Sequence, residues 1–331
     1  VLACGMFGAI SGSTVATVVA LGGFMIPQLI KKGYPEKYSI GLMTTSPNLG
    51  VIIPPSIGMI LYSMISNVSL EGLFATGFIP GILIMLIVCV YTYFVFRGDT
   101  DIVRQPVPSI GHVWRVFKEC FWALMLPVII FGGIFSGAFT ANEAAVVACV
   151  YAFAVELFIY RTLKWGQVKE ITVSSAVTSA TLLILVAGAT CFGRLLTLED
   201  IPGRITEMVV STIQSPFVFL LAMNALLLVI GMFMDIISAT MILGPVFLPM
   251  LDSFGINTMH FGLVMTVNLA IGYCTPPMGV SLYITGALTN RDLIYVSKAV
   301  IPFIIIQIAV LLFCTYFPDV ILWLPRIAGY L

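Results

Sequence analysis

Runs of roughly 20 apolar residues recur along this chain and limit its possible folds more than any other feature. An α-helix of that length crosses the ~30 Å hydrocarbon core of a bilayer. The chain is 60% hydrophobic and 9% charged, with 15 basic and 15 acidic residues, and it has no polar segment long enough for a soluble domain. We therefore predict an all-α polytopic protein whose surroundings are the lipid bilayer and which has no nucleic-acid partner.

Two proline pairs interrupt the apolar runs, in "GVIIPPS" (50–56) and "GYCTPPM" (272–278). Proline removes a backbone donor and clashes with the preceding turn, so each pair should break its helix near the middle. A broken helix has free N–H groups on one half and free C=O groups on the other, and these attract anions and cations respectively. The sequence thus predicts two places where irregular backbone can bind ions.

The proline pairs belong to a longer internal repeat. A shift of 222 positions gives a gap-free register over about 80 residues, in which Pro27 meets Pro249, Gly50 meets Gly272 and Pro80 meets Pro302. The matches concentrate at Gly and Pro, which fix backbone shape. Each copy is predicted to hold a hairpin, a broken helix and a whole helix, at 1–32, 38–65 and 73–96, and again at 217–253, 260–288 and 293–318. Other apolar segments lie at about 120–140, 142–161 and 172–196.

The two hairpins have polar centres, "SGST" (11–14) and "MDIIS" (234–238). Halves of ~16 residues are too short to cross a bilayer twice, which favours re-entrant hairpins. The predicted organisation is a first repeat over 1–97, a cytoplasmic loop over 98–119 and a second repeat over 120–331. Repeat symmetry predicts roughly 100 further residues, in about three helices, ahead of Val1 in the natural chain.

Basic residues orient the copies, since cytoplasmic loops are enriched in Lys and Arg. Most of the 15 basic residues fall at 31–37, 97–118, 161–169 and 291–298. With these segments inside, hairpin 1 opens to the cytoplasm, hairpin 2 opens to the other face, and the C-terminus lies outside. The copies are then inverted, and inverted repeats with broken helices near the midplane are typical of secondary transporters.

Three stretches carry a family resemblance: "MFGAISGST" to "PPSIGMILYS" (6–63), "TANEAAVVACVYAF" (140–153) and "MDIISATM" to "PPMGVSLYI" (234–284). Together they resemble the large membrane subunit of the tripartite ATP-independent periplasmic (TRAP) transporters, over essentially the whole chain. The C4-dicarboxylate branch is the most similar, and sialic-acid carriers share the motifs. The chain departs from the family at Ser281, where Asn is frequent, and at Ser46-Pro47-Asn48, which replaces a run of small residues.

The resemblance implies a sodium-coupled importer of organic acids that works by an elevator movement in the inner membrane of a bacterium or archaeon. It also implies a soluble periplasmic binding protein and a small four-helix membrane subunit as partners. Sodium is then the coupling ion, with no covalent cofactor and no other metal. We found no nucleotide-binding loop in the sequence, in keeping with an ion gradient as the energy source.

Polar groups at mid-membrane depth are the candidate ligands, because oxygen atoms suit sodium and because an ionisable group at that depth is a functional candidate. The predicted sodium ligands are Ser11, Ser13, Thr14, Asn48, Gly50, Asp235, Ser238, Gly272 and Thr275. The predicted substrate contacts are Ser46, Pro54, Pro55, Ser56, Asn268, Pro276, Pro277 and Ser281. Purely structural roles are the alternative: a helix cap for Asp235, and backbone satisfaction for Asn48 and Asn268. Glu143 of "TANE" has capping-box spacing and is predicted to be a cap.

Three other functions remain as alternatives. An enzyme is disfavoured because the hydrolase motifs HExxH and GxSxG do not occur in the sequence. An ion channel also uses re-entrant hairpins, although it normally gathers pore segments around an oligomer axis. A sodium-coupled dicarboxylate or citrate carrier that needs no binding protein is the main alternative.

Overall fold

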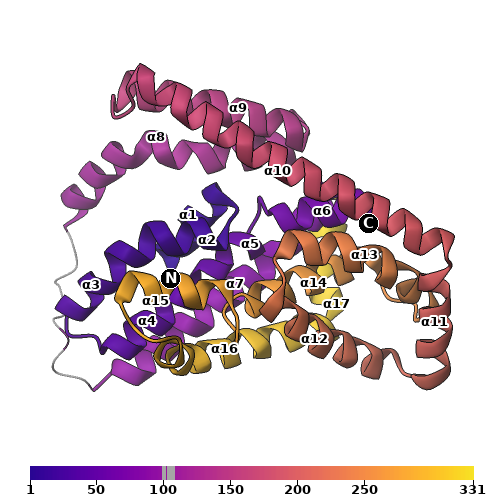
Figure 1. Cartoon of the computed structure of the whole chain (residues 1–331). Helices are drawn as coiled ribbons and strands as arrows, with labels where there is room; N and C mark the ends of the chain where they lie inside the picture. Colours follow the sequence, from indigo (N-terminus) through magenta and orange to yellow (C-terminus); the bar gives the residue numbers. More distant parts are fainter. Residues whose placement is uncertain (99–101, 103–108) are drawn as a thin grey trace. The chain divides into compact units, whose positions relative to one another are not determined.

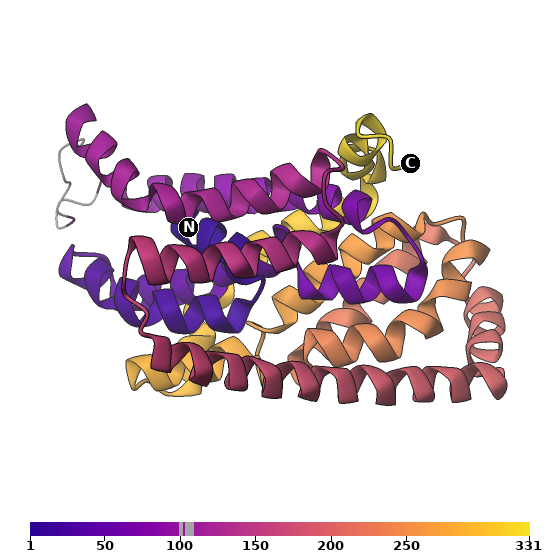
Figure 2. The same cartoon turned by 90° about the horizontal axis from the view of Figure 1, so that it is seen from above.

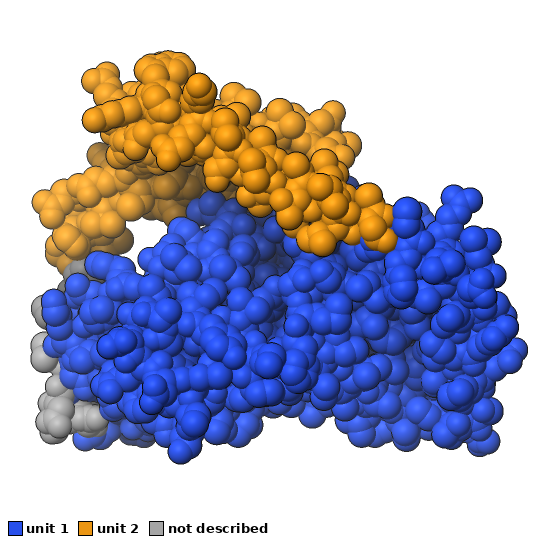
Figure 3. Space-filling view, in the orientation of Figure 1, with its two compact units in different colours: residues 1–103, 189–331 blue, residues 104–188 orange. Residues whose placement is uncertain are grey.

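The structure is a computed structural model that describes residues 1–98, 102 and 109–331. Every regular element in those residues is a helix, and nine helical segments among them are long and apolar enough to cross a membrane. The predicted all-α membrane class is confirmed. The chain divides into two compact units, residues 1–103 with 189–331 (unit 1) and residues 104–188 (unit 2) (Figure 3). These units differ from the predicted repeats, whose boundaries stay a prediction.

The first half of unit 1 holds hairpin 1, a broken helix and a whole helix, in the predicted order (Figure 1). Hairpin 1 comprises α1 (Leu2–Ser11), α2 (Thr14–Thr17), a π-helical turn (Val18–Gly22) and α3 (Gly23–Lys31). The broken helix comprises α4 (Glu36–Thr45), a 3-10 turn (Ser46–Asn48), α5 (Leu49–Ile52) and, after the break, α6 (Ile57–Ser66). The whole helix is α7 (Leu70–Phe96).

The second half of unit 1 repeats this order, as the orange and yellow helices of Figure 2. It follows a short helix, α11 (Ile201–Thr212), and comprises hairpin 2, formed by α12 (Pro216–Phe233) and α13 (Ile236–Ser253), the broken pair α14 (Thr258–Gly272) and α15 (Val280–Thr289), and α16 (Leu293–Tyr316). A last helix, α17 (Pro318–Ile327), was not predicted separately. Both helices break at the predicted proline pairs, and the Pro54–Pro55 and Pro276–Pro277 peptide bonds are both cis.

Unit 2 contains α8 (Ile110–Phe135), α9 (Ala141–Ala154), a π-helical turn (Val155–Ile159) and the first part of α10 (Trp165–Leu198). The predicted capping box at the start of α9 is confirmed, since Thr140 and Glu143 bond each other's backbone N–H. The predicted loop is wrong over 110–119, which form the start of α8. Ser109 caps this helix by accepting the N–H of His112 at 3.3 Å. Residues 99–101 and 103–108 of the predicted loop lie outside the described residues.

The start of α8 is helical because its apolar side chains recur at helical spacing. Ile110, Val113, Trp114 and Phe117 lie at positions i, i+3, i+4 and i+7, which share a single helix face. The basic residues that suggested a loop lie between them, and the Lys118 ammonium sits 5.6 Å from the centre of the Trp114 ring. The basic residues alone therefore gave a wrong position for the end of the predicted loop.

The arms of hairpin 2 are longer than the sequence suggested. Helices α12 and α13 each have 18 residues and are apolar enough to count among the candidate spans. At 1.5 Å per residue such an arm is about 27 Å long, close to the thickness of the hydrocarbon core. The length argument for a re-entrant hairpin is therefore wrong for hairpin 2, and re-entrancy itself stays a prediction.

Helix α14 forms the centre of unit 1, since every residue from Met259 to Gly272 is buried. It packs against α12, α13 and α16, and also against α5, α6 and α7 (Figure 1). The two broken helices also contact each other. The Thr44 hydroxyl donates to the Thr285 hydroxyl at 3.1 Å, and the Tyr62 hydroxyl donates to the Thr258 carbonyl at 2.9 Å. Each broken helix is thus held by elements of the other half of the chain.

Glycines bring one arm of each hairpin into backbone contact with a broken helix. A Cβ on Gly50 of α5 would lie 2.8 Å from the Cα of Gly8 in α1. A Cβ on Gly272 of α14 would lie 2.5 Å from the carbonyl carbon of Gly231 in α12. These separations are shorter than real Cβ contacts, so only glycine fits. Each hairpin therefore packs directly beside the break in its own half of the chain.

Candidate functional site

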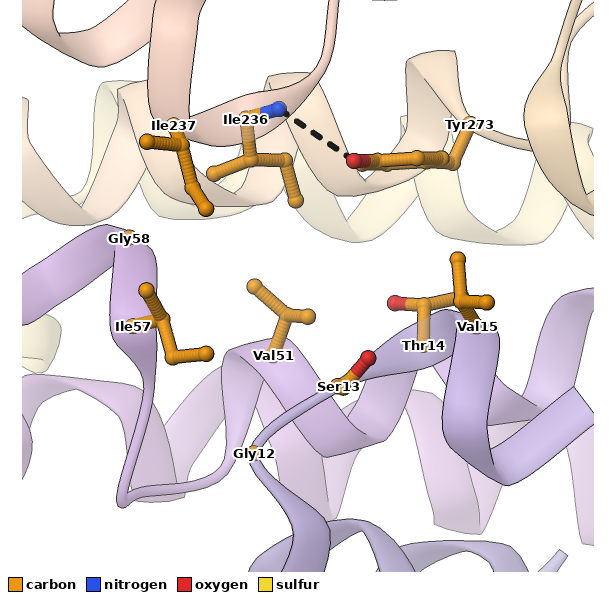
Figure 4. Close-up of a pocket in the computed structure, with 10 residues that line it drawn as sticks. All are labelled: Gly12, Ser13, Thr14, Val15, Val51, Ile57, Gly58, Ile236, Ile237 and Tyr273. Carbon is orange, nitrogen blue, oxygen red and sulfur yellow. Dashed lines mark hydrogen bonds between the residues drawn. The ribbon is translucent and has the colours of Figure 1, made fainter. Parts of the chain in front are cut away.

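The tips of the two hairpins meet at a cavity of about 70 Å³ (Figure 4). Hairpin 1 and the first broken helix contribute Gly12, Ser13, Thr14, Val15, Val51, Ile57 and Gly58, whereas α13 and the second break contribute Ile236, Ile237 and Tyr273. Gly12 ends α1 in the left-handed conformation with φ 61°, and a Cβ there would lie 2.9 Å from the Pro55 carbonyl oxygen. The tip of hairpin 1 is thus seated against the first break.

The two tips are capped in the same way at positions 222 apart in sequence. Ser13 accepts the N–H of Ala16 at 3.3 Å, and the Asp235 carboxylate accepts the N–H of Ser238 at 3.0 Å. A carboxylate is favourable at this position because it faces the positive end of the helix dipole. Asp235 therefore has the capping role that was the alternative interpretation of this residue. Its role as a sodium ligand stays a prediction.

A compact group of oxygens lies at the tip of hairpin 1. The Ser11 hydroxyl is 3.1 Å from the Thr17 hydroxyl and 3.3 Å from the Ser13 carbonyl oxygen, and the Thr17 hydroxyl donates to that same carbonyl at 2.8 Å. A Cβ on Gly50 would lie 3.3 Å from Thr17 Oγ1, so the first broken helix passes directly beside the group. The sequence analysis missed Thr17, although it lies one helical turn after Ser13 and so shares its face.

Four buried side-chain oxygens in the described residues have no hydrogen-bond partner: Thr14 Oγ1, Ser46 Oγ, Asn268 Oδ1 and Ser281 Oγ. All four belong to residues predicted as ligands. The polar neighbour of Ser281 is the thiol of Cys274, which is a weak hydrogen-bonding group. An unpaired buried polar group costs about 1–3 kcal/mol, and native proteins contain few of them. These oxygens are therefore candidate contacts for a bound substrate or cation.

Asn48 is fully buried and lies in a hydrogen-bonded network outside the cavity. Its amide donates to Gln307 of α16 at 2.9 Å, and the thiol of Cys274 lies 3.3 Å from its carbonyl oxygen. Gln307 also donates to the Thr45 carbonyl at 3.0 Å. These bonds give Asn48 a structural role, but with side chains and not with the backbone groups of the predicted alternative, and its role as a sodium ligand stays a prediction. Gln307 was missed by the sequence analysis, although a lone polar residue in an apolar span is a recognisable signal.

Asn268 has an equivalent network on the other side of α14. Its amide donates to the side-chain oxygen of Asn224 at 2.6 Å and to the Val264 carbonyl at 2.9 Å. Asn224 in turn donates to the Thr315 hydroxyl at 3.0 Å. Asn224, like Gln307, is a buried polar residue that the sequence analysis did not select. The Asn268 amide nitrogen therefore makes structural hydrogen bonds, whereas its side-chain oxygen is unpaired.

The two breaks differ in whether their backbone carbonyl groups receive hydrogen bonds. Pro54 and Pro55 have no N–H, so they cannot donate to the carbonyls of Gly50 and Val51, four positions earlier. The second part of this helix starts at Ser56, whose hydroxyl accepts the N–H of Met59 at 3.4 Å. The first break therefore leaves two carbonyls without their usual helical donors.

The second break provides its own donors. Gly272 accepts the N–H of Thr275 at 3.0 Å, and the Tyr273 carbonyl accepts the N–H of Ser281 at 3.0 Å. The Thr275 hydroxyl donates to the Ile271 carbonyl at 2.8 Å. Pro276 is half-buried and Pro277 is exposed, so this break lies closer to the surface than the first one. Thr275 and the two prolines do not line the cavity.

The cavity is lined mainly by apolar residues, with polar side chains only at Ser13, Thr14 and Tyr273, and it has no basic side chain. The ten lining residues include no Lys, Arg or His. In Figure 4 the hydroxyls of Ser13 and Thr14 point into the space below Ile236 and Tyr273. Among the described residues no group of three or more His, Cys, Asp or Glu could hold a metal ion. An anion in this cavity would therefore depend on hydroxyls, backbone N–H groups and any cations bound with it.

Comparison with known proteins identifies the family. The model of the tripartite ATP-independent periplasmic transporter, DctM component, matches residues 1–320. The chain is 39% identical to a C4-dicarboxylate TRAP transporter large permease of Pseudomonas aeruginosa, over 99% of this chain and 77% of that protein. It is 38% identical to an isethionate TRAP transporter permease, DctMQ, of Oleidesulfovibrio alaskensis, over 96% of this chain and 50% of that one. It is 33% identical to the sialic acid TRAP permease SiaT of Haemophilus influenzae, over 97% and 52%. The chain with this cavity therefore belongs to the large permease component of the TRAP transporters, which is a transporter family and not an enzyme family.

Proposed function

We propose that this permease imports a small organic acid, such as a C4-dicarboxylate, with the energy of a sodium gradient. The observation that carries the proposal is the cavity between the hairpin tips, which is lined by the hydroxyls of Ser13 and Thr14 among apolar residues and has no basic side chain. Several related permeases are named for C4-dicarboxylates, isethionate and sialic acid, which are acids, and two others are named for ectoine. A carboxylate in a low-dielectric site without an opposite charge is strongly disfavoured. Sodium ions bound beside the substrate would offset that charge.

The oxygen group of Ser11, Ser13 and Thr17 is the best candidate for a sodium site. It supplies two hydroxyls and one carbonyl, which are hard oxygen ligands, and it lies beside Gly50. The Gly50 carbonyl, deprived of its helical donor by Pro54, is a further candidate ligand. Asp235 at the opposite tip adds negative charge near the cavity and favours a bound cation there.

The substrate would lie between the tips, in contact with the hydroxyls of Ser13 and Thr14. Helices α2 and α13 both begin at the cavity, so the positive ends of their dipoles face a bound carboxylate. Helix α2 has only four residues and contributes less than the longer α13. The unpaired oxygens of Ser46, Asn268 and Ser281 are further candidate contacts when the cavity is enlarged.

We also propose that the two halves are inverted repeats and that the hairpins move together as an elevator. The support is the correspondence in unit 1: caps at Ser13 and Asp235, proline breaks 222 positions apart, and a glycine contact beside each break. The periplasmic C-terminus follows from the same inversion.

Labelling of an Ala328→Cys variant in intact cells, with an impermeant reagent, should succeed, whereas a cysteine at Gly111 should be protected. Equal labelling of both would contradict the inversion.

The partners follow from the tripartite family: a periplasmic substrate-binding protein and a small membrane subunit, proposed to have four helices. Uptake should be measured in proteoliposomes that contain the full permease and the small subunit, with succinate and a cognate binding protein outside. We expect uptake with an inward sodium gradient and none when potassium replaces sodium. Uptake that is independent of sodium, with proton gradients collapsed, would disprove the coupling. Uptake without the binding protein would instead favour the binding-protein-independent carrier, and rapid dissipative flux would favour a channel.

Asp235→Asn tests the charge separately from the cap. Asparagine caps a helix about as well as aspartate, so hairpin 2 should keep its structure. The variant should need several-fold more sodium for half-maximal uptake, because a negative charge close to the cation is lost. Asp319→Asn, at an exposed ion pair in α17, is the matched control and should leave the sodium dependence unchanged.

A further inference from the structure

We infer that Tyr273 is a latch on the cavity, a positioning residue whose hydroxyl must leave hairpin 2 before the substrate can bind. Tyr273 directly follows the last residue of α14, and its hydroxyl accepts the N–H of Ile236 at 3.3 Å (Figure 4). Ile236 is the first residue of α13, so this contact joins the second break to the tip of hairpin 2 along one wall of the cavity. The inference rests on the proposed function, because it concerns the same cavity.

Two of the N–H groups at the start of α13 are already in use. The Ile236 N–H is bonded by Tyr273, and the Ser238 N–H is bonded by Asp235. A substrate carboxylate that binds this helix start therefore competes with a side chain of the protein. The phenol oxygen of Tyr273 is the weaker competitor, since it is neutral, whereas hydrogen bonds to an ionised acceptor are roughly twice as strong. The Tyr273 contact is the one that a carboxylate can replace.

The volume of the cavity also indicates that its wall must change before the substrate can bind. At about 70 Å³ it has roughly half the volume of the ~150 Å³ cavity that holds benzene in another protein. A four-carbon dicarboxylate has more non-hydrogen atoms than benzene. The substrate is therefore larger than this cavity. Part of the wall must move.

Tyr273 is the part of the wall that can move with least disturbance of the fold. Its backbone is held, because its carbonyl accepts the Ser281 N–H and the preceding Gly272 packs against Gly231. Its side chain is only half-buried and is held by the single bond to Ile236. Rotation of the side chain frees the N–H and enlarges the cavity in one movement, without displacement of the break.

Tyr273→Phe removes the hydroxyl and keeps the ring. Hydrogen exchange of the full permease, followed in the peptide that contains Ile236, should be faster in this variant than in the wild type. In succinate uptake with sodium and the binding protein, the substrate concentration for half-maximal rate should fall about two- to tenfold, the factor expected for one hydrogen bond that no longer competes. The maximal rate should change little. Tyr62→Phe, which also loses one buried hydroxyl but lies outside the cavity, is the control and should leave this concentration unchanged.

The outcomes separate the latch from the proposed function. Unchanged exchange at Ile236 would show that the contact does not hold the hairpin tip, and would overturn the inference. A rise in the half-maximal concentration would also overturn it, because the hydroxyl would then be a substrate ligand. If the wild type shows no sodium-dependent succinate uptake, the proposed function fails, and faster exchange in Tyr273→Phe would still support the latch.

Discussion

Replacement of Thr14 by valine should stabilise the fold and impair transport at the same time. The side chain is 2% exposed, and its hydroxyl has no hydrogen-bond partner. Valine has nearly the same shape, so the main change is the removal of an unpaired polar group that costs about 1–3 kcal/mol. We expect the free energy of unfolding of the ligand-free protein to rise by up to about that amount. A hydroxyl that instead had a structural role would lower it on removal.

Thr266→Val is the matched control. Thr266 is also 2% exposed, and its hydroxyl donates to the Gly262 carbonyl at 2.8 Å. Loss of this bond should lower the free energy of unfolding by about 0.5–1.5 kcal/mol. Both variants are to be compared with the wild type by thermal unfolding in detergent without sodium or substrate, and by sodium-dependent succinate uptake per folded molecule. The two threonine variants should therefore shift the melting temperature in opposite directions.

The transport measurement completes the test of Thr14. If its hydroxyl contacts the substrate or a cation, uptake should require about tenfold more of that ligand, which corresponds to one lost hydrogen bond of about 1.4 kcal/mol. A Thr14→Val protein that melts below the wild type, and whose uptake falls only with the amount of folded protein, would refute the reasoning. Thr14 would then be an ordinary structural residue.

Two further substitutions test the packing of unit 1 and the network at its centre. Gly272→Ala would put a Cβ 2.5 Å from the Gly231 backbone and should destabilise the protein by about 1–3 kcal/mol. Gly132→Ala in α8 meets open space and should stabilise the protein by about 1 kcal/mol. The melting temperatures of the two variants are to be compared with that of the wild type. Gln307→Leu should cost about 1–3 kcal/mol in the same assay because it leaves the buried Asn48 amide without its acceptor, and an unchanged melting temperature would contradict the network.

Features that depend on local backbone chemistry were predictable from the sequence. Proline pairs break helices wherever they occur, so the breaks at Pro54 and Pro276 were placed correctly, and the capping box at Thr140 was read from its spacing. Contacts between distant segments were not predictable. The partner of Asn48 lies 259 positions away, and Tyr273 reaches an N–H that is 37 positions earlier. A single sequence shows that these residues are unusual but not what they touch.

The ligand set stays a prediction for the same reason. Depth and residue type selected Thr14, Ser46, Asn268 and Ser281, and these have the unpaired oxygens in the structure. The expected depth in the membrane did not distinguish these residues from Asn48. Asn48 is equally polar and buried, but its hydrogen bonds are to other groups of the protein. A polar residue that binds a ligand can be distinguished from a structural one only when its hydrogen-bonding partners are known.

The exchange of contacts between the two halves of the chain has a consequence for how this protein is made. Bonds between Thr44 and Thr285, and between Thr45 and Gln307, join residues 241 and 262 positions apart. Synthesis adds about 5–20 residues per second, so the first half must wait in the membrane for ten seconds or more without these long-range partners. Such long-range contacts slow folding, and they leave the early helices open to premature association or degradation. A chain cut short by a stop codon after α7 should therefore be inserted but rapidly degraded.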